Sequence, residues 1–220
     1  HGDADVHALH AVLAGGGGSL ITASLLNCDL TFTISQRGEH WVGNALAVLA
    51  TVEALGGDCA IAGLALADMS GIKGRGERHR IALGGGSGGG GDFLLIDESY
   101  NANPVSMAAT LQSLGEERGV KRRIAVLGPM RELGPRSDAL HAGLAPSLID
   151  AKIDLAIFIG PEMEPLADAL GGQVAVVRAA DADQATDLLL EAAGPGDAVL
   201  VKASNTVGLA RLVERLRGAG

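Results

Sequence analysis

The stretch Phe93-Leu94-Leu95-Ile96-Asp97-Glu98-Ser99-Tyr100-Asn101-Ala102-Asn103-Pro104 decides the fold of this chain. Its first four residues are apolar and predict a buried strand, and a segment typical of a helix follows the polar residues. A strand that ends in a polar cluster places it at the carboxyl edge of a sheet, where open α/β folds bind ligands. An Asn-rich strand-to-helix turn, with Pro104 at the first helical position, has the same pattern.

The rest of the second half alternates strands and helices, which predicts an α/β fold with a doubly wound, mostly parallel sheet covered by helices on both faces. We expect strands at residues 80–83, 93–96, 123–127, 155–159, 174–177 and 199–201, and helices at 105–116, 138–151, 162–170, 183–193 and 207–216. Before this half, residues 1–36 have β-like alternation and helices fit residues 41–55 and 59–67. The glycine-rich, basic segment 70–76 marks a domain boundary.

Composition excludes several classes of protein. Hydrophobic residues make up 47% of the 220 residues but aromatic residues only 2%, so the core consists of Ala, Leu, Val and Ile, which suits parallel strands. A net charge of -9 argues against binding to nucleic acid or to anionic membranes. There is no apolar run long enough to span a bilayer and no signal-peptide pattern. Cys28 and Cys59 are typical of reduced thiols in the cytoplasm.

Two common nucleotide-binding signatures do not apply to this sequence: one is in the wrong context and the other is absent. The glycine tract 84–91 contains GxGxxG, but it joins two predicted strands and does not open a helix, so a Rossmann-type oxidoreductase is disfavoured. This tract and residues 15–19 are typical of hairpin loops. None of the four lysines follows a glycine, which excludes a GxxxxGK[ST] phosphate-binding loop within the chain. Phosphate binding must therefore come from arginines, from backbone amides or from a segment outside this chain.

Four further clusters have polar residues at positions that could bind ligands. They are Glu39–Ala47, with His40 and Asn44 one turn apart on a helix; Gly74–Gly76, with Arg75 between glycines; Leu127–Gly134; and Val201–Asn205, with Lys202 at a strand end. Taken singly, each is equally typical of a solvated helix, linker or strand end. His141 is expected to be a surface or boundary histidine. His1, His7 and His10 have no suitably spaced partner and predict no metal site.

Taken in order, the five clusters resemble motifs of the Mur ligases of peptidoglycan synthesis. Those motifs are a His-x-x-x-Asn-Ala-Leu-Ala helix, a Gly-Arg linker, Asp-x-Ser-Tyr-Asn-Ala-Asn-Pro, Leu-Gly-Asp-Met-x-Glu-Leu-Gly and a Val-Lys-Gly-Ser-Arg strand end. The Ser-Tyr-Asn-Ala-Asn-Pro string is typical of the member that adds D-alanyl-D-alanine to UDP-N-acetylmuramoyl-tripeptide. The resemblance covers nearly the whole chain, which corresponds to about the second half of a family protein.

The resemblance implies an ATP-dependent amide ligase that works through an acyl phosphate. Residues 1–73 would be the end of a central α/β ATPase domain, and residues 74–220 a C-terminal Rossmann-like domain. The cofactors would be ATP and Mg²⁺, and the partners UDP-N-acetylmuramoyl-tripeptide, D-alanyl-D-alanine and the N-terminal domains of the same protein. The phosphate-binding loop, a modified lysine and the main Mg²⁺ ligands would lie upstream of His1, so this chain alone would be inactive.

The resemblance also assigns roles to single residues. Those that would bind ATP are His40, Asn44, Arg75, Asp97, Tyr100, Asn101 and Asn103. Asn44 would contact the adenine, Arg75 would meet the phosphates and act in catalysis, and Asn103 would shape the turn. Lys202 and Ser204 would face the substrates.

The chain departs from the family motifs at Pro129, where Asp is usual, and at Ala203 and Asn205, where Gly and Arg are usual. These departures affect substrate contacts more than ATP contacts. A nucleotide-binding module without catalysis remains the alternative to a ligase.

Overall fold

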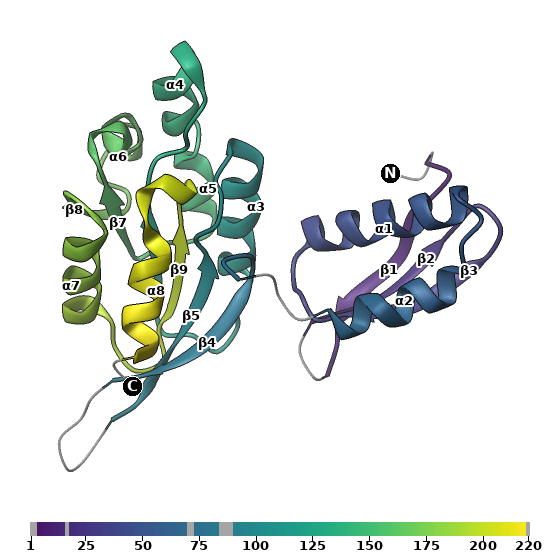
Figure 1. Cartoon of the computed structure of the whole chain (residues 1–220). Coiled ribbons are helices and arrows are strands. Elements are labelled where there is room, and N and C mark those ends of the chain that lie inside the picture. Colours follow the sequence, from purple (N-terminus) through teal and green to yellow (C-terminus); the bar gives the residue numbers. More distant parts are fainter. Residues whose placement is uncertain (1–3, 16–17, 70–72, 84–89, 219–220) are drawn as a thin grey trace. The chain divides into compact units, whose positions relative to one another are not determined.

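The computed structural model describes residues 4–15, 18–69, 73–83 and 90–218. It divides into two compact units, residues 1–71 and 72–220. Figure 1 shows both units, and each is described by itself. Their division lies within the glycine-rich, basic segment, two residues before the expected start at residue 74.

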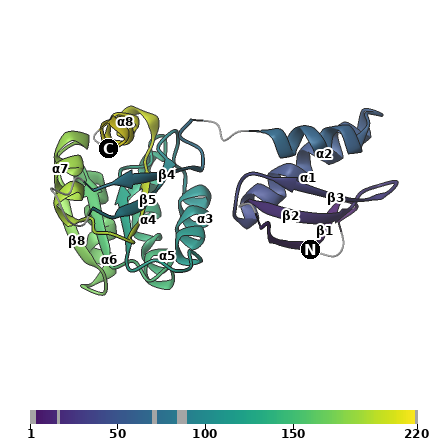
Figure 2. The ribbon, with the colours of Figure 1, turned by 90° about the horizontal axis from the view of Figure 1, so that it is seen from below.

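The first unit is a small antiparallel sheet covered by two helices. Strands β1 (His7–Leu13), β2 (Ser19–Ser24) and β3 (Asp29–Ile34) pair in the order β1-β2-β3. Helices α1 (Glu39–Ala54) and α2 (Cys59–Asp68) lie on one face of this sheet (Figure 2). Helix α2 begins after Asp58, whose carboxylate accepts hydrogen bonds from the N–H groups of Ala60 and Ile61.

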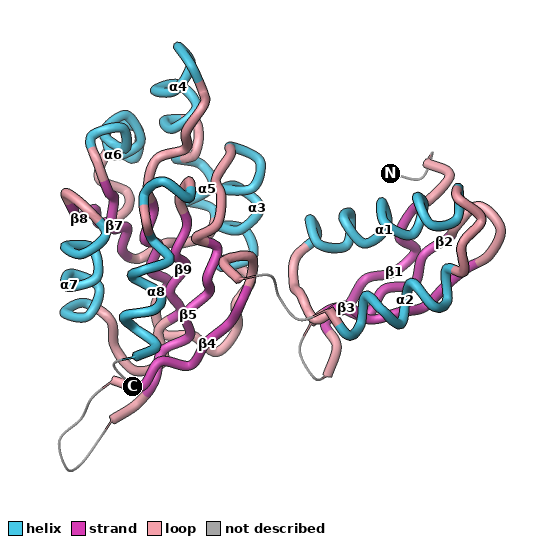
Figure 3. Tube along the Cα trace, in the orientation of Figure 1, coloured by secondary structure: helices cyan, strands magenta, loops and turns pink. Residues whose placement is uncertain are grey.

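The second unit is a six-stranded sheet with helices on both faces, as expected (Figure 3). Its strands are β4 (Glu77–Ala82), β5 (Asp92–Glu98), β6 (Arg123–Leu127), β7 (Leu155–Ile159), β8 (Ala175–Ala179) and β9 (Ala198–Lys202). Its helices are α3 (Pro104–Gly115), α4 (Ser137–Ala142), α5 (Ala145–Asp150), α6 (Glu164–Leu170), α7 (Ala182–Ala192) and α8 (Leu209–Gly218), with short 3₁₀ turns before α4, α6 and α8. The strand order is β4-β5-β9-β6-β7-β8, and only β4 runs antiparallel to its neighbour.

Alternation along the strands builds two cores. Leu94 and Ile96 of β5 belong to the core on the side of α3, α5 and α6, whereas Phe93 and Leu95 belong to the core on the side of α7 and α8. The chain leaves β5 towards α3 on one face and leaves β9 towards α8 on the other. Because these neighbouring connections diverge, the β5–β9 boundary is a topological switch point, where α/β sheets bind ligands.

The structure corrects three predicted elements. The strand expected at residues 80–83 is β4, which begins three residues earlier, at Glu77, and ends at Ala82. The helix expected at residues 138–151 is two helices, α4 and α5, because Pro146 has no N–H to donate and is tolerated only in a first turn. The strand expected at residues 93–96 extends through Asp97 and Glu98, so both carboxylates belong to the strand itself. The expected hairpin loops lie partly outside the described residues, at 16–17 and 84–89; the strands that flank them pair antiparallel.

None of the helices in the described ranges has the length and hydropathy of a membrane span.

Candidate functional site

The candidate site lies at the carboxyl ends of β5 and β9. These parallel strands are in register, so Glu98 stands beside Lys202 at their last positions. Lys202 is also in register with Leu127, the last residue of β6. The motifs at residues 97–104, 127–134 and 201–205 therefore meet at one edge of the sheet, although they are far apart in sequence.

A buried ion pair lies at this site, between the last residues of β5 and β9. The Lys202 ammonium lies 3.4 Å from a carboxylate oxygen of Glu98 and donates a 2.9 Å hydrogen bond to the carbonyl oxygen of Asn101. Only 3% of the Lys202 side chain and 11% of the Glu98 side chain are exposed. Burial raises the pKa of Glu98 and lowers the pKa of Lys202, while their mutual attraction opposes both shifts.

Arg75 covers the aromatic ring of the motif. Its guanidinium carbon lies 4.4 Å from the centroid of the Tyr100 ring, a cation–π arrangement on two exposed side chains. The backbone fixes this contact, because Tyr100 N–H donates to Gly74 O at 3.0 Å and Gly76 N–H donates to Asp97 O at 2.8 Å. Gly74 has φ +75°, and a Cβ there would lie 3.0 Å from Tyr100 N, so the close approach needs glycine.

The turn between β5 and α3 uses its polar side chains largely on itself. The Asn103 side chain accepts from Ser106 N–H at 2.8 Å, and the Ser106 hydroxyl accepts from Asn103 N–H, which forms a capping box at the start of α3. Asn101 Oδ1 accepts from Ala102 N–H at 2.9 Å. Asn103 therefore shapes the turn, as expected, and the amide group of the exposed Asn101 can still donate.

Asp97 faces a different direction from the rest of the motif. It pairs with Glu77 across the β4–β5 ladder, and its carboxylate lies within 4.8 Å of ligand atoms of Glu77 and His79. One of its oxygens also accepts from Ser99 N–H at 3.0 Å. Its side chain is thus turned towards β4, on the side of the sheet that α8 covers.

Ser204 joins the end of β9 to the loop after β6. Its hydroxyl accepts from Arg131 N–H at 2.9 Å, and its own N–H donates to the carbonyl oxygen of Pro129 at 3.2 Å. His141 also supports the loop after β6, because its Nε2 accepts a hydrogen bond from Met130 N–H at 2.9 Å. The expectation of a surface or boundary histidine was wrong, since His141 is completely buried and supports this loop.

The remaining candidates, His40 and Asn44, belong to the first unit. They lie one turn apart near the start of α1, with His40 half-buried and Asn44 exposed. The ring of His40 lies 5.7 Å from that of Trp41. Both side chains are thus on the helix that the sequence predicted.

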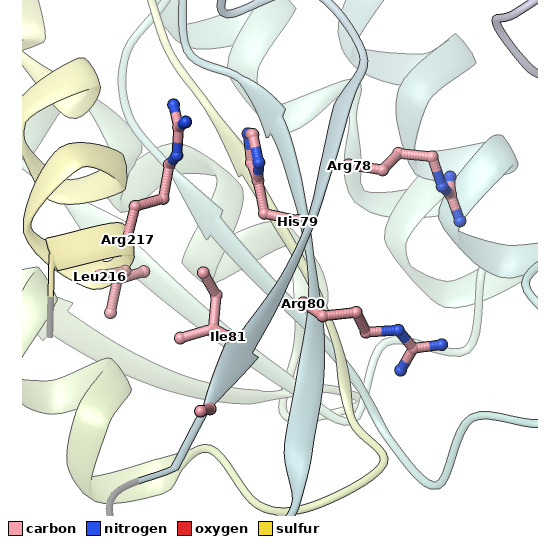
Figure 4. A pocket seen from close by; sticks show the side chains of 7 residues that line it. Arg78, His79, Arg80, Ile81, Leu216 and Arg217 are labelled. Carbon is pink, nitrogen blue, oxygen red and sulfur yellow. The ribbon is translucent and has the colours of Figure 1, made fainter. Parts of the chain in front are cut away.

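Sequence reasoning missed three residues near the site: Glu77, Glu98 and His79. Glu77 and His79 alternate along β4 and so share one face, a signal visible in the sequence once the strand is known to begin at Glu77. His79 also lines an open pocket between β4 and α8, together with Arg78, Arg80, Ile81, Ala82, Leu216 and Arg217 (Figure 4).

Comparison with known proteins gives one family. Residues 79–205 match the model of the Mur ligase, glutamate ligase domain. A Mycobacterium tuberculosis UDP-N-acetylmuramoyl-tripeptide–D-alanyl-D-alanine ligase is 31% identical over 201 residues, 81% of this chain and 38% of that protein. A Streptomyces avermitilis UDP-N-acetylmuramate–L-alanine ligase is 32% identical over 217 residues, 93% of this chain and 44% of that protein.

Solved structures share the fold. A MurF structure from Acinetobacter baumannii has a TM-score of 0.79 at 24% identity, covering 99% of this chain and 46% of that one. A MurF ligase from Thermotoga maritima, in complex with ADP, has a TM-score of 0.74 at 22% identity, covering 98% and 48%. The chain thus spans less than half the length of these relatives. Because the family model covers more than half of the chain and the motif residues gather at one edge of its sheet, the chain belongs to the Mur ligase family.

Proposed function

We propose that this chain is part of an ATP-dependent amide ligase that adds D-alanyl-D-alanine to UDP-N-acetylmuramoyl-tripeptide in peptidoglycan synthesis. The observation that carries the proposal is the contact of Arg75 with Tyr100 beside the β5–β9 switch point. This contact joins the Gly-Arg linker to the Ser-Tyr-Asn-Ala-Asn-Pro motif. That motif resembles one typical of tripeptide ligases, and tripeptide ligases are among the proteins to which this chain is similar. The contact leaves an exposed guanidinium at the edge where α/β sheets bind ligands.

In this reaction the terminal carboxylate of the tripeptide attacks the γ-phosphorus of ATP, which forms an acyl phosphate and releases ADP. The amine of D-alanyl-D-alanine then attacks the acyl carbon, loses a proton and expels phosphate. Arg75 offsets the charge that builds up on the transferred phosphoryl group, because a guanidinium can hold two phosphate oxygens at once. Mg²⁺ would share this task, with its ligands outside this chain.

Residues of each unit are proposed to bind the nucleotide. Asn44 contacts the adenine with His40 beside it, and Tyr100 with Asn101 lines the adenine and ribose. Asp97 belongs to this set in the proposal, although its carboxylate faces β4, so its contribution would be to hold residues 74–76 through the hydrogen bond from Gly76. A single amide or ring contact of this kind is worth about 1 kcal/mol, so no one of them dominates affinity.

Lys202 and Ser204 act at the substrate end in this proposal. Both already hold neighbouring backbone: Lys202 binds the Asn101 carbonyl and Ser204 binds Arg131 N–H. Their contribution to ligation would therefore include fixing the two loops between which the substrates meet. The unusual Pro129 lies in one of these loops and has no carboxylate at the position where Asp is usual.

We assign residues 1–73 to the end of the central ATPase domain and residues 74–220 to the C-terminal domain. Large apolar side chains exposed on the first unit support this, since a larger domain would cover them. They include Leu9, Val12 and Leu13 on β1, and Leu55, Ile61 and Leu64. We further propose a cytoplasmic location, which suits a UDP-linked substrate and the two free thiols.

A second reaction, with UDP-N-acetylmuramate as acceptor and L-alanine as the added amino acid, also has an observation in its favour. The L-alanine ligase is 32% identical to this chain and the tripeptide ligase 31%. The test is phosphate release from ATP by the natural protein that carries this segment. We expect release that needs both UDP-N-acetylmuramoyl-tripeptide and D-alanyl-D-alanine. Release with UDP-N-acetylmuramate and L-alanine instead would assign the other reaction, and ATP binding without any release would favour a non-catalytic module.

A further inference from the structure

Three potential metal ligands converge on the face of the β4–β5 ladder that α8 covers. Glu77 and His79 alternate along β4, and Asp97 stands opposite Glu77 on β5. One ligand atom from each residue lies within 4.8 Å of the other two. The three residues come from two hydrogen-bonded strands, so the backbone holds their Cβ atoms in a fixed relation.

Two of these ligand atoms lack a hydrogen-bond partner. In the described part of the chain, neither Glu77 Oε2 nor His79 Nε2 has a hydrogen-bond partner, although both atoms are shielded from solvent. They lie 3.7 Å apart. A buried oxygen or nitrogen without a hydrogen bond is destabilising, so two such atoms side by side favour a further group bound between them.

The charge of the three ligands suits a divalent cation, although Arg217 of α8 lies on the same side as His79 (Figure 4) and Lys73 is close enough to interact with Glu77. Two carboxylates and a neutral imidazole carry two negative charges in total. The nearest arginines of β4 point to the opposite face (Figure 4) and are already paired: Arg78 with Glu117 at 2.7 Å, and Arg80 with Asp92 at 2.9 Å. The Glu77 and His79 side chains are 26% and 19% exposed, so an ion reaches them without crossing the core.

We propose that Glu77, His79 and Asp97 bind a divalent transition metal of the Zn²⁺ type. Imidazole nitrogen with carboxylate oxygen is a donor set that Zn²⁺ accepts and Mg²⁺ avoids. In a tetrahedral zinc site with bonds of about 2.0–2.1 Å, ligand atoms lie about 3.3 Å apart. The 3.7 Å between Glu77 and His79 needs only a small side-chain rotation to reach this value.

Such a metal would have a structural effect on the candidate site. Arg75 lies two residues before Glu77, and the hydrogen bonds Gly76 N–H to Asp97 O and Tyr100 N–H to Gly74 O connect the two strands just beyond the cluster. A metal that clamps β4 to β5 would therefore hold the Arg75 backbone against Tyr100. This site is separate from the Mg²⁺ that phosphoryl transfer uses, and the inference does not rest on the proposed ligase activity.

The test uses the 220-residue chain, stripped with a chelator and then titrated with ZnCl₂ against a chromogenic competitor. We expect one tight equivalent per chain, visible d–d absorption when Co²⁺ replaces Zn²⁺, and at least about tenfold weaker binding in both Glu77→Gln and His79→Gln. Zn²⁺ should also raise Tm and slow amide exchange at Gly76 and Tyr100 in the wild type, but not in His79→Gln.

The matched controls are His10→Gln and Cys28→Ser, which remove exposed donors of the first unit and should leave zinc binding unchanged. Wild-type affinity in both Glu77→Gln and His79→Gln would overturn the proposal. So would the absence of zinc binding, or binding lost only in the two controls.

Discussion

The ammonium of Lys202 lies 3.4 Å from the carboxylate of Glu98, and the two side chains are largely buried at the ends of neighbouring parallel strands. The same ammonium donates a hydrogen bond to the carbonyl oxygen of Asn101, in the middle of the Asp97–Pro104 motif. One buried cation thus connects β9, the last strand in the sequence, with the turn after β5. Such a pair fixes geometry more than it adds stability, because desolvation offsets much of the attraction.

Lys202→Met should destabilise the second unit by about 3–5 kcal/mol, because it leaves the carboxylate of Glu98 buried without a partner. Far-UV circular dichroism during urea unfolding would measure this. Lys202→Met with Glu98→Gln should recover most of the loss, and Lys121→Met, at an exposed position, should cost less than about 0.5 kcal/mol. A Lys202→Met protein as stable as the wild type would mean that the pair is not formed.

The loss of stability caused by Lys202→Met should also depend on pH in a defined direction. Burial already raises the pKa of Glu98, and loss of the neighbouring ammonium raises it further. A carboxyl group with a raised folded-state pKa contributes stability below its unfolded pKa and loses it as pH rises through the folded value. Lys202→Met should therefore differ least from the wild type in acid and most at neutral pH.

Much of the fold could be predicted because strands buried on both faces are continuous apolar runs. Phe93–Ile96 and Arg123–Leu127 are of this kind, and glycines and polar residues separate them from the helices. The break between α4 and α5 was missed, although Pro146 marks it, because the apolar period of 3.6 residues continues across it. Periodicity is thus a weaker guide to a helix boundary than a single proline.

The site could be predicted only in part, because it depends on strand order. β9 is the last strand in sequence, yet it inserts between β5 and β6, and only this insertion brings Lys202 to Glu98. Nothing local to either residue indicates their pairing. His141 was misjudged for the same reason: its partner Met130 lies in a loop whose position depends on β6 and β9.

A carboxylate of the first unit should control its stability in acid. Partial desolvation opposes the shift, but hydrogen bonds from Leu26 N–H and from the backbone and side chain of Asn27 lower the pKa of Glu53. A lowered folded-state pKa gives stability above the unfolded value, near 4.5, which is lost as pH falls through the folded one. Urea unfolding followed by Trp41 fluorescence should therefore show a smaller free energy of unfolding in acid.

Glu53→Gln is the test of this assignment. The variant should be less stable than the wild type at neutral pH, and its stability should change less between neutral pH and pH 4. Glu39→Gln, at an exposed position of the same helix, should keep the wild-type pH dependence. Equal pH profiles for Glu53→Gln and the wild type would show that other carboxylates govern the acid transition.

The chain of 220 residues should bind ATP only weakly. It lacks a GxxxxGK[ST] sequence, so the proposed base and ribose contacts would act without the loop that binds the phosphates in P-loop proteins. Isothermal titration with ATP and Mg²⁺ should give a Kd far above that of a full-length family member measured in parallel. Tight binding by this chain would place the phosphate site among its own arginines and amides.

Asn44→Ala in the full-length protein should raise KM for ATP by about tenfold and leave kcat nearly unchanged. The proposed neutral hydrogen bond to the adenine is worth up to about 1.5 kcal/mol, which is about tenfold, and it is equally strong in the ground state and in the transition state. Steady-state kinetics at varied ATP would measure both constants. Thr51→Ala, two turns further along α1 and also exposed, is the matched control and should change neither.

Arg75→Ala in the full-length protein should act on kcat instead. A charge that stabilises the phosphoryl group mainly in the transition state is worth about 2.7–4 kcal/mol, or about 10²–10³ in rate. Arg75→Lys should recover only part of this, because an ammonium keeps the charge but neither stacks on Tyr100 nor binds two oxygens as a fork. Arg80→Ala removes an exposed arginine of β4 that pairs with Asp92, and it should keep wild-type kcat. If Arg75→Ala also kept wild-type kcat, Arg75 would be a solvated linker residue whose contact with Tyr100 serves only the fold.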